Sequence, residues 1–342
     1  MGDADATAAN FGFMDMVLAL KWIQNNIHSF SGDRERVTIF GQSSGGTAVF
    51  ALLASPQASG LFHRAYSLSG SARMDANIET TRKHNLNDPE LFVQRSKCAS
   101  DVGQSQELYS CLSSLSLDEV VAAAPPMWDA LEETTDEIGR TDLPLSPDGA
   151  FNRLDSFGWA GHYAPLAVLD GDFLPMESSI AEYFQGGGGN TVPTIVGVMA
   201  EELDMDALLD VTFPSSHEEL REQLAAHLKW RFGSVDAALT VLDKVLADPW
   251  YTIGTIDGGL AITAERAYAR FTSDLNFRCP NGALAGALVA GREALDQNPV
   301  YHVVTNQGPG PGGKSFSLSL SLSTPHLLPV ALSDDGFAQS QF

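Results

Sequence analysis

The residues that most restrict the fold of this chain run from Arg36 to Leu53 and read RVTIFGQSSGGTAVFALL. The apolar segment at 36–40 is typical of a buried strand, and the small and apolar residues at 44–54 are typical of a helix. Between them, Gly41 to Gly45 match the pattern G-x-S-x-G, which is informative when a strand precedes it and a helix follows. The sequence therefore predicts that Ser43 lies on a sharp turn from strand to helix.

Such a turn gives Ser43 a particular chemistry. The strand brings the serine to the carboxyl edge of a sheet, and small neighbours let the chain close tightly behind it. The following helix begins with unpaired N–H groups and the positive end of its dipole. The backbone N–H of Ser44 can then face the oxyanion that forms when Ser43 Oγ attacks a carbonyl. The alternative is an ordinary turn in which a serine caps the helix.

Hydrophobic periodicity extends this pattern along the chain. Strands are expected at 65–70, 194–199 and 300–304, and helices at 13–27, 117–124 and 218–228. Strands that alternate with helices predict an α/β fold with a mostly parallel sheet and helices on both faces. The alternating Ser and Leu residues at 317–323 indicate either an edge strand or a disordered loop.

Charge excludes several kinds of partner. The formal net charge of −23 repels phosphate backbones and anionic lipid, so binding to nucleic acid or to a membrane surface is not expected. No apolar run has the length of a membrane span, and the polar start MGDADATAANF lacks the pattern of a signal peptide. No cysteines and histidines have zinc spacing, so we expect no metal.

Three cysteines are present, at 98, 111 and 279. Cys98 and Cys111 bracket a short polar segment, and a disulfide between them would close a loop of about 14 residues and contribute roughly 3 kcal/mol. The alternative is a pair of reduced thiols, as in cytosolic proteins. The sequence favours the disulfide, with Cys279 outside the pair.

Several segments resemble the type-B carboxylesterases, the carboxylesterase and cholinesterase family of α/β-hydrolases. The first is FGFMDMVLALKWIQNNIHSFSGDRERVTIFGQSSGG around Ser43. Others follow in the family's order: LFHRAYSLSGSA, the small cysteine loop at 98–112, VLDGDFLP, IVGVMAEELDM, DLNFRCP and VYHVVTNQ. The resemblance implies one α/β-hydrolase domain over residues 1–342, incomplete at both ends, which needs no cofactor.

The resemblance also implies a catalytic triad of serine, glutamate and histidine, in that chain order. Counting five residues from Gly197 gives Glu202 as the acid, although Leu203 replaces the family's glycine and leaves Glu201 or Asp204 as alternatives. The base must follow the last strands, which leaves two histidines. His302 lies within a strand, where a structural histidine is expected, so His326 in STPHLLPVAL is favoured.

The resulting expectation is a serine hydrolase that cleaves small carboxylic esters through an acyl-enzyme, with Ser43, Glu202 and His326 as the triad. The segment before Ser43 contains no HGG-type loop, which in the family supplies further oxyanion donors. The rival expectation is therefore a truncated, weakly active or inactive member that acts as a binding module. A lipase or peptidase on the same fold is a third possibility. Family members are often secreted, but the sequence predicts neither compartment nor oligomeric state.

Overall fold

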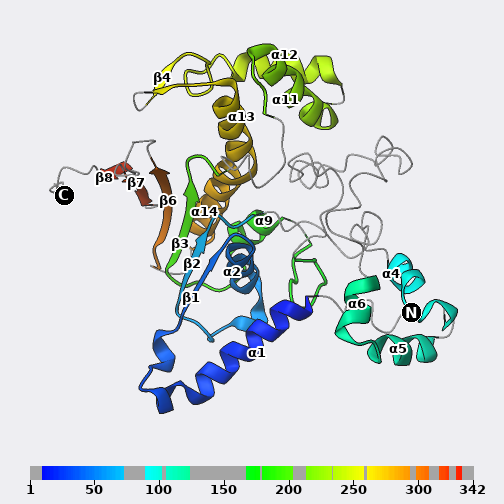
Figure 1. The fold of residues 1–342 in the computed structure, drawn as a ribbon. Helices are drawn as coiled ribbons and strands as arrows, with labels where there is room; N and C mark the ends of the chain where they lie inside the picture. Colours follow the sequence, from blue (N-terminus) through cyan, green and yellow to red (C-terminus); the bar gives the residue numbers. More distant parts are fainter. Residues whose placement is uncertain are drawn as a thin grey trace.

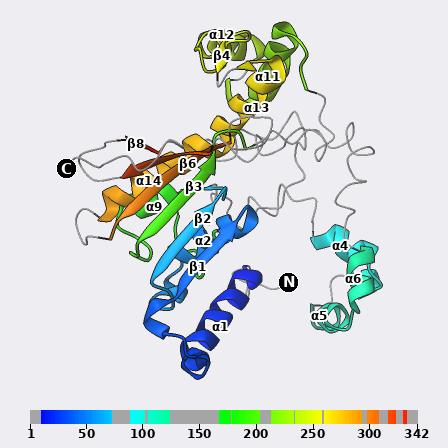
Figure 2. The ribbon, with the colours of Figure 1, turned by 60° about the vertical axis from the view of Figure 1, so that its left-hand side comes forward.

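The computed structural model describes residues 10–72, 89–101, 105–123, 167–177, 179–202, 213–232, 234–257, 260–292, 298–307, 316–322 and 329–332. Figures 1 and 2 show these residues as a twisted sheet with helices packed beside it and further helices at its ends.

The sheet has six strands in the order β1-β2-β3-β6-β7-β8. The first four strands are parallel, and β7 and β8 pair antiparallel at one side. The strand bounds are β1 Thr38–Gln42, β2 Arg64–Leu68, β3 Thr194–Met199, β6 Val300–Gln307, β7 Phe316–Leu322 and β8 Pro329–Leu332, with a separate hairpin of β4 Ile256–Asp257 and β5 Leu260–Ala261. The predicted α/β class with a mostly parallel sheet is confirmed.

Helices α1, α2, α6 and α11 lie where the sequence predicted helices, and the other described α-helices were not predicted. The α-helices are α1 Phe11–Asn26, α2 Ser44–Ala54, α4 Pro89–Arg95, α5 Ser105–Ser113, α6 Leu117–Ala123, α9 Ile180–Gln185, α11 His217–Phe232, α12 Val235–Val245, α13 Ala264–Ser273 and α14 Cys279–Arg292. Short 3₁₀ turns lie at Ile27–Phe30, Arg34–Arg36, Pro56–Ala58 and Ala99–Asp101, and a π-helical turn, η6, spans Asp274–Arg278.

The sequence predicted helices on both faces of the sheet, but in the part of the chain that the structure describes, the helices that contact the sheet lie on one face. The buried side chains of β1 and β2, such as Ile39 and Ala65, join α2, α9 and α14 in one apolar core. Helix α1 packs against α2 through Phe13, Val17 and Leu20, spaced as one face of a helix. The other face of the sheet carries the ring of Phe40, which is 61% exposed.

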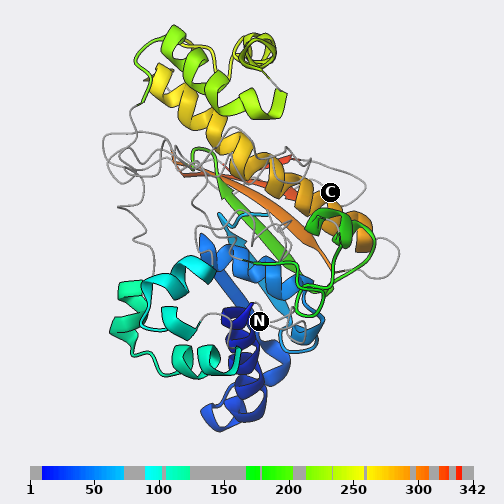
Figure 3. The same cartoon turned by 90° about the vertical axis from the view of Figure 1, so that its right-hand side faces the viewer.

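A second core lies beyond the end of the sheet, where α11 packs against both α12 and α13 (Figure 3). Helix α13, the π-turn η6 and α14 follow one another without a break from Ala264 to Arg292. The first part of this run belongs to the second core and its last part to the core under the sheet. The run therefore links the two cores directly.

The Ser and Leu repeat forms strand β7, and β8 pairs with it on the side away from β6. The expectation of an edge strand is therefore wrong within the described sheet, because β8 lies outside β7. The pattern PVAL at 329–332 was too short to predict β8 from the sequence. Among the described helices, none combines the length and the apolar character that crossing a membrane requires.

The cysteine segment forms a small helical unit of its own. The structure joins Cys98 and Cys111 through a disulfide, with Cα atoms 5.7 Å apart, and leaves Cys279 unpaired and exposed. Lys97 and Glu119 form an ion pair beside it, with Nζ and Oε1 2.7 Å apart. That Cys98 and Cys111 form this disulfide in the purified protein remains a prediction.

Candidate active site

Ser43 occupies a strained turn between β1 and α2. Its backbone has φ 58° and ψ −123°, a conformation that residues with a side chain rarely adopt. The Ser43 N–H donates to Leu68 O at 3.0 Å, and the Thr47 N–H donates to Ser43 O at 3.0 Å. One bond ties the turn to β2 and the other to the first turn of α2. Ser43 is exposed, at the carboxyl edge of the parallel strands.

Glycines allow the tight approach of strand, turn and helix. A Cβ on Gly41 would lie 2.0 Å from the carbonyl oxygen of Gly45, and a Cβ on Gly46 would lie 2.8 Å from the Cα of Gly70. Both distances are far below van der Waals contact, and the atoms met are backbone, which cannot rotate away. By contrast, a Cβ on Gly45 would have nothing within 4 Å. The packing therefore requires glycine at 41 and 46.

This difference gives a matched pair of variants. Gly41→Ala should destabilise the protein by about 2–3 kcal/mol, because the added methyl must separate β1 from α2. Gly45→Ala should be neutral or slightly stabilising, because alanine is the better helix former and has room there. Chemical unfolding of both variants checks this. Equal stability of the two variants would contradict the packing account of the turn.

The backbone N–H groups of the first turn of α2 point toward the same edge. Ser44 is the first residue of this helix, so its N–H has no acceptor within the helix. Together with the helix dipole, this is the arrangement that stabilises an anion beside the serine. The role of Ser44 as an oxyanion donor remains a prediction, and it is one that this geometry permits.

Glu202 follows β3 at the same edge of the sheet. The strand register aligns Gln42, Leu68 and Gly197, so β1, β2 and β3 end side by side. Glu202 Oε1 accepts the Met199 N–H at 2.7 Å, and the Glu202 N–H donates to Ser273 Oγ at 2.8 Å. The first bond bends the chain after β3 back upon itself, and the second ties this loop to α13.

Two opposing effects act on the pKa of the Glu202 carboxyl. Burial raises the pKa of the Glu202 carboxyl above its usual value, while hydrogen bonds from the Met199 N–H and the Ser69 hydroxyl oppose that rise. Ser69 follows β2 directly and has a positive φ of 50°, and its N–H donates to Gly197 O at 2.7 Å. Sequence reasoning missed Ser69, although its place at a strand end, in YSLSG, was a usable signal.

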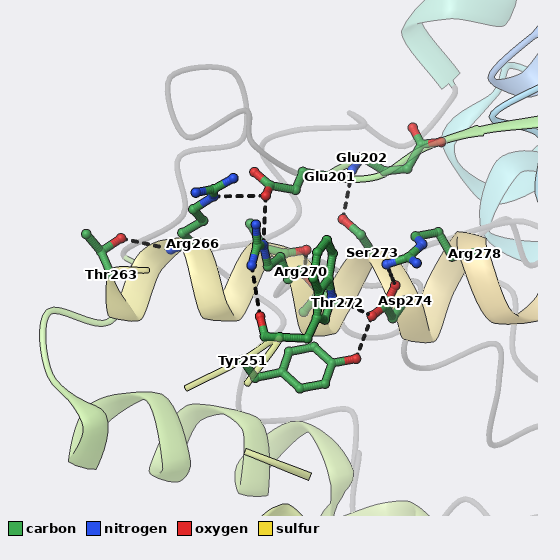
Figure 4. A network of polar contacts seen from close by, with 12 residues as sticks. Glu201, Glu202, Tyr251, Thr263, Arg266, Arg270, Thr272, Ser273, Asp274 and Arg278 are labelled. Atoms are coloured by element: carbon green, nitrogen blue, oxygen red, sulfur yellow. Dashed lines mark hydrogen bonds and ion pairs between the residues drawn. The ribbon is translucent and has the colours of Figure 1, made fainter. Parts of the chain in front are cut away.

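Glu201, the neighbouring carboxylate, faces the opposite way (Figure 4). Its Oε1 accepts from Arg266 Nε at 2.9 Å and from Arg270 Nε at 2.8 Å, both on α13. The Arg270 side chain is 1% exposed, and its guanidinium also lies 3.9 Å from the centre of the Trp250 ring. Glu201 is therefore engaged in a buried ion-pair cluster.

The sequence also indicated His326 as the base, His302 as an alternative base and Asp204 as an alternative acid. His326 and Asp204 lie outside the described residues. His302 lies within β6, paired with Val196 of β3, and its ring faces α14, where a Cβ on Gly282 would come within 3.6 Å of it. The structure thus gives His302 a place inside the layer between sheet and helix. Among the described residues, no group of His, Cys, Asp and Glu has the arrangement of a metal site.

His302 should make stability sensitive to acid. Burial, and then the charge of Arg278, lower the pKa of His302 below its usual value of about 6.5. The unfolded chain therefore binds a proton at this position that the folded chain resists, so stability should fall as the pH drops below about 6.5. His302→Gln should reduce this fall.

Urea unfolding at several pH values measures the effect, with His28→Gln as a control because His28 is exposed. An acid dependence that is unchanged in His302→Gln would contradict the assignment of a buried neutral imidazole.

Comparison with known proteins is consistent with this geometry. The model of the Carboxylesterase family matches residues 1–310. Liver carboxylesterase of Sus scrofa is 33% identical over 280 residues, which cover 81% of this chain and 43% of that protein. Carboxylesterase 1D of Rattus norvegicus is 34% identical over 226 residues, covering 65% and 34%. Cocaine esterase of Homo sapiens is 41% identical over 125 residues, covering 36% and 21%.

The matches span between 21% and 43% of the length of these relatives. The family match, however, covers most of this chain and includes the strand, turn and helix around Ser43. The resemblance in the sequence and the α/β fold agree with it. The chain therefore belongs to the carboxylesterase family.

Proposed function

We propose that this chain carries the catalytic serine of an esterase that cleaves small carboxylic esters through an acyl-enzyme. The observation that carries the proposal is the strained turn at Ser43, with φ 58°. Strain of this kind persists where surrounding structure enforces it, and it concentrates at functional sites. A capping serine would not need it, since Ser43 makes no side-chain cap to α2.

The proposed chemistry uses Ser43 as the nucleophile, the Ser44 N–H as an oxyanion donor and His326 as the base. Ser43 Oγ attacks the ester carbonyl carbon while His326 takes its proton, and the carbonyl oxygen becomes an oxyanion beside the Ser44 N–H. The C–O bond to the alcohol then breaks, and His326 returns the proton to the departing alkoxide. Water, deprotonated by His326, attacks the acyl-enzyme, and His326 then gives that proton to Ser43 Oγ as the bond to the acyl group breaks and the acid leaves.

Glu202 is proposed as the acid that orients the imidazole and stabilises it when it is charged. Its carboxylate lies at the same edge of the sheet as Ser43 and is held by the Met199 N–H. The contacts of Glu201 with Arg266 and Arg270 make Glu201 a poorer candidate, because an acid already bound by two guanidiniums has little capacity left for an imidazole. The role of His326 rests on the sequence resemblance.

The proposed substrate class follows from the family. The relatives named above are carboxylesterases and a cocaine esterase, so small esters are the proposed substrates. Hydrolysis of p-nitrophenyl acetate by the purified chain tests the proposal, with a rapid burst of nitrophenol expected if an acyl-enzyme accumulates. Turnover no faster than that of a Ser43→Ala variant would refute it.

A further inference from the structure

Glu201 and Ser273 together hold the loop that carries Glu202, and this arrangement is separate from the groups that would touch substrate. Glu201 and Glu202 are adjacent, yet their side chains point in opposite directions from the end of β3 (Figure 4). The Glu201 carboxylate is bound by α13, whereas the Glu202 carboxylate returns to the Met199 N–H. The two carboxylates therefore differ in their contacts: the Glu201 carboxylate binds α13, and the Glu202 carboxylate does not.

Three residues on one side of α13 make the contact. Arg266, Arg270 and Ser273 are spaced by four and three residues, which places them on one face of a helix. The first two bind the Glu201 side chain, and Ser273 Oγ accepts the Glu202 N–H at 2.8 Å. The helix thus binds two successive residues of the loop, one through its side chain and one through its backbone.

Arg270 gives this contact its rigidity. Its guanidinium is buried, so it requires an anion and hydrogen-bond acceptors in place. Glu201 supplies the anion, and the Trp250 carbonyl accepts a second bond from Arg270 Nη1 at 2.9 Å. The Trp250 ring covers the guanidinium, and Trp250 Nε1 donates to Asp274 at 3.1 Å. Moving the Glu201 carboxylate away would therefore break an ion pair with a buried guanidinium, which is costly.

The π-turn η6 begins directly after Ser273. Single π-turns within α-helices recur at functional sites because they shift the residues on either side of them. Here the turn separates the part of the helix in the second core from the part under the sheet. Ser273, at the junction, is fully buried and faces the end of β3.

We propose that Glu201 and Ser273 are positioning residues that fix the Glu202 carboxylate relative to the catalytic serine and thereby couple the second core to the active site. The inference rests on the proposed function. A displacement of about 1 Å at a catalytic group lowers the rate by up to about 10²-fold. Glu201→Gln removes the anion, and Ser273→Ala removes the acceptor of the Glu202 N–H without changing charge.

Both variants should lower kcat for p-nitrophenyl acetate by about 10-fold to 10²-fold, with KM changed by less than about twofold. Rates are expressed per active site titrated with an organophosphonate, so that unfolded protein does not contribute. Asp243→Asn is the matched control. It breaks an exposed ion pair with Arg221 between α11 and α12, the helices that form the second core, with Arg221 Nε and Asp243 Oδ1 2.6 Å apart, and should leave kcat unchanged.

A purely structural role would lower the melting temperature of Glu201→Gln and Ser273→Ala but leave kcat per titrated site at the parent value, and that result would overturn the inference. If Glu201→Gln folds poorly, Ser273→Ala decides alone, since it leaves the ion pairs of Arg270 intact. Absence of Ser43-dependent hydrolysis in the parent chain would instead overturn the proposed function, and this inference with it.

Discussion

Ser43→Ala should lower kcat for a short activated ester by about 10⁵-fold to 10⁶-fold. The alanine removes the only atom proposed to bond the acyl group, and the triad members act as a unit, so little activity should survive. The fold should be unaffected, because the contacts that hold the turn are made by the backbone of residue 43. Steady-state hydrolysis and thermal unfolding measure the two effects.

The control for this variant is Ser59→Ala. Ser59 is exposed and follows the short 3₁₀ turn after α2, outside the turn at Ser43. It should retain the parent activity. Residual activity of Ser43→Ala within tenfold of the parent would mean that another nucleophile does the work.

Glu202→Gln should lower kcat by about 10⁴-fold. The amide can still accept the Met199 N–H, so the loop should keep its shape. The amide carries no negative charge, however, and it can present a donor where the imidazole also presents one. The imidazole would then lose both its orientation and the stabilisation of its charged form.

The comparison variant is Asp204→Asn, the alternative acid in the sequence. It should keep most of the activity. If Asp204→Asn loses activity and Glu202→Gln does not, the acid has been assigned to the wrong residue. The pH dependence of kcat/KM for the parent gives a further comparison, since Glu202 must be ionised in the active form and burial raises its pKa.

The strand, turn and helix around Ser43 could be predicted because all of their determinants are local. The apolar run, the glycines and the small residues of α2 lie within 18 consecutive positions. The strand at 194–199 was predicted with its observed bounds for the same reason, since it is a short apolar run between polar segments. Patterns of this kind depend only on residues that are close in sequence, so they predict individual strands and helices.

The environment of the proposed acid could not be predicted, because it depends on residues far along the chain. Glu201 meets Arg266 and Arg270 across 65 and 69 positions, and Glu202 meets Ser273 across 71. No spacing rule connects such residues, so the sequence favoured Glu202 but left Glu201 and Asp204 as alternatives. The contacts distinguish them physically, since one carboxylate neutralises a buried arginine and the other does not.

The position of β7 in the sheet could not be predicted either. Its alternation of Ser and Leu suggested a strand, but its place inside the sheet depends on pairing with β8, which is only four residues long. A strand's position in a sheet is set by its partners and not by its own pattern.

The most direct test of the account is to locate the covalent adduct of a fluorophosphonate. Such reagents react with a serine only where the hydroxyl is activated and an oxyanion is stabilised beside it. After reaction with the chain, digestion and mass spectrometry should find the phosphonyl group on the peptide that contains Ser43, with Ser44 and Ser69 unmodified. An adduct on any other residue, or an unmodified Ser43 in folded protein, would contradict the assignment of Ser43 as the nucleophile.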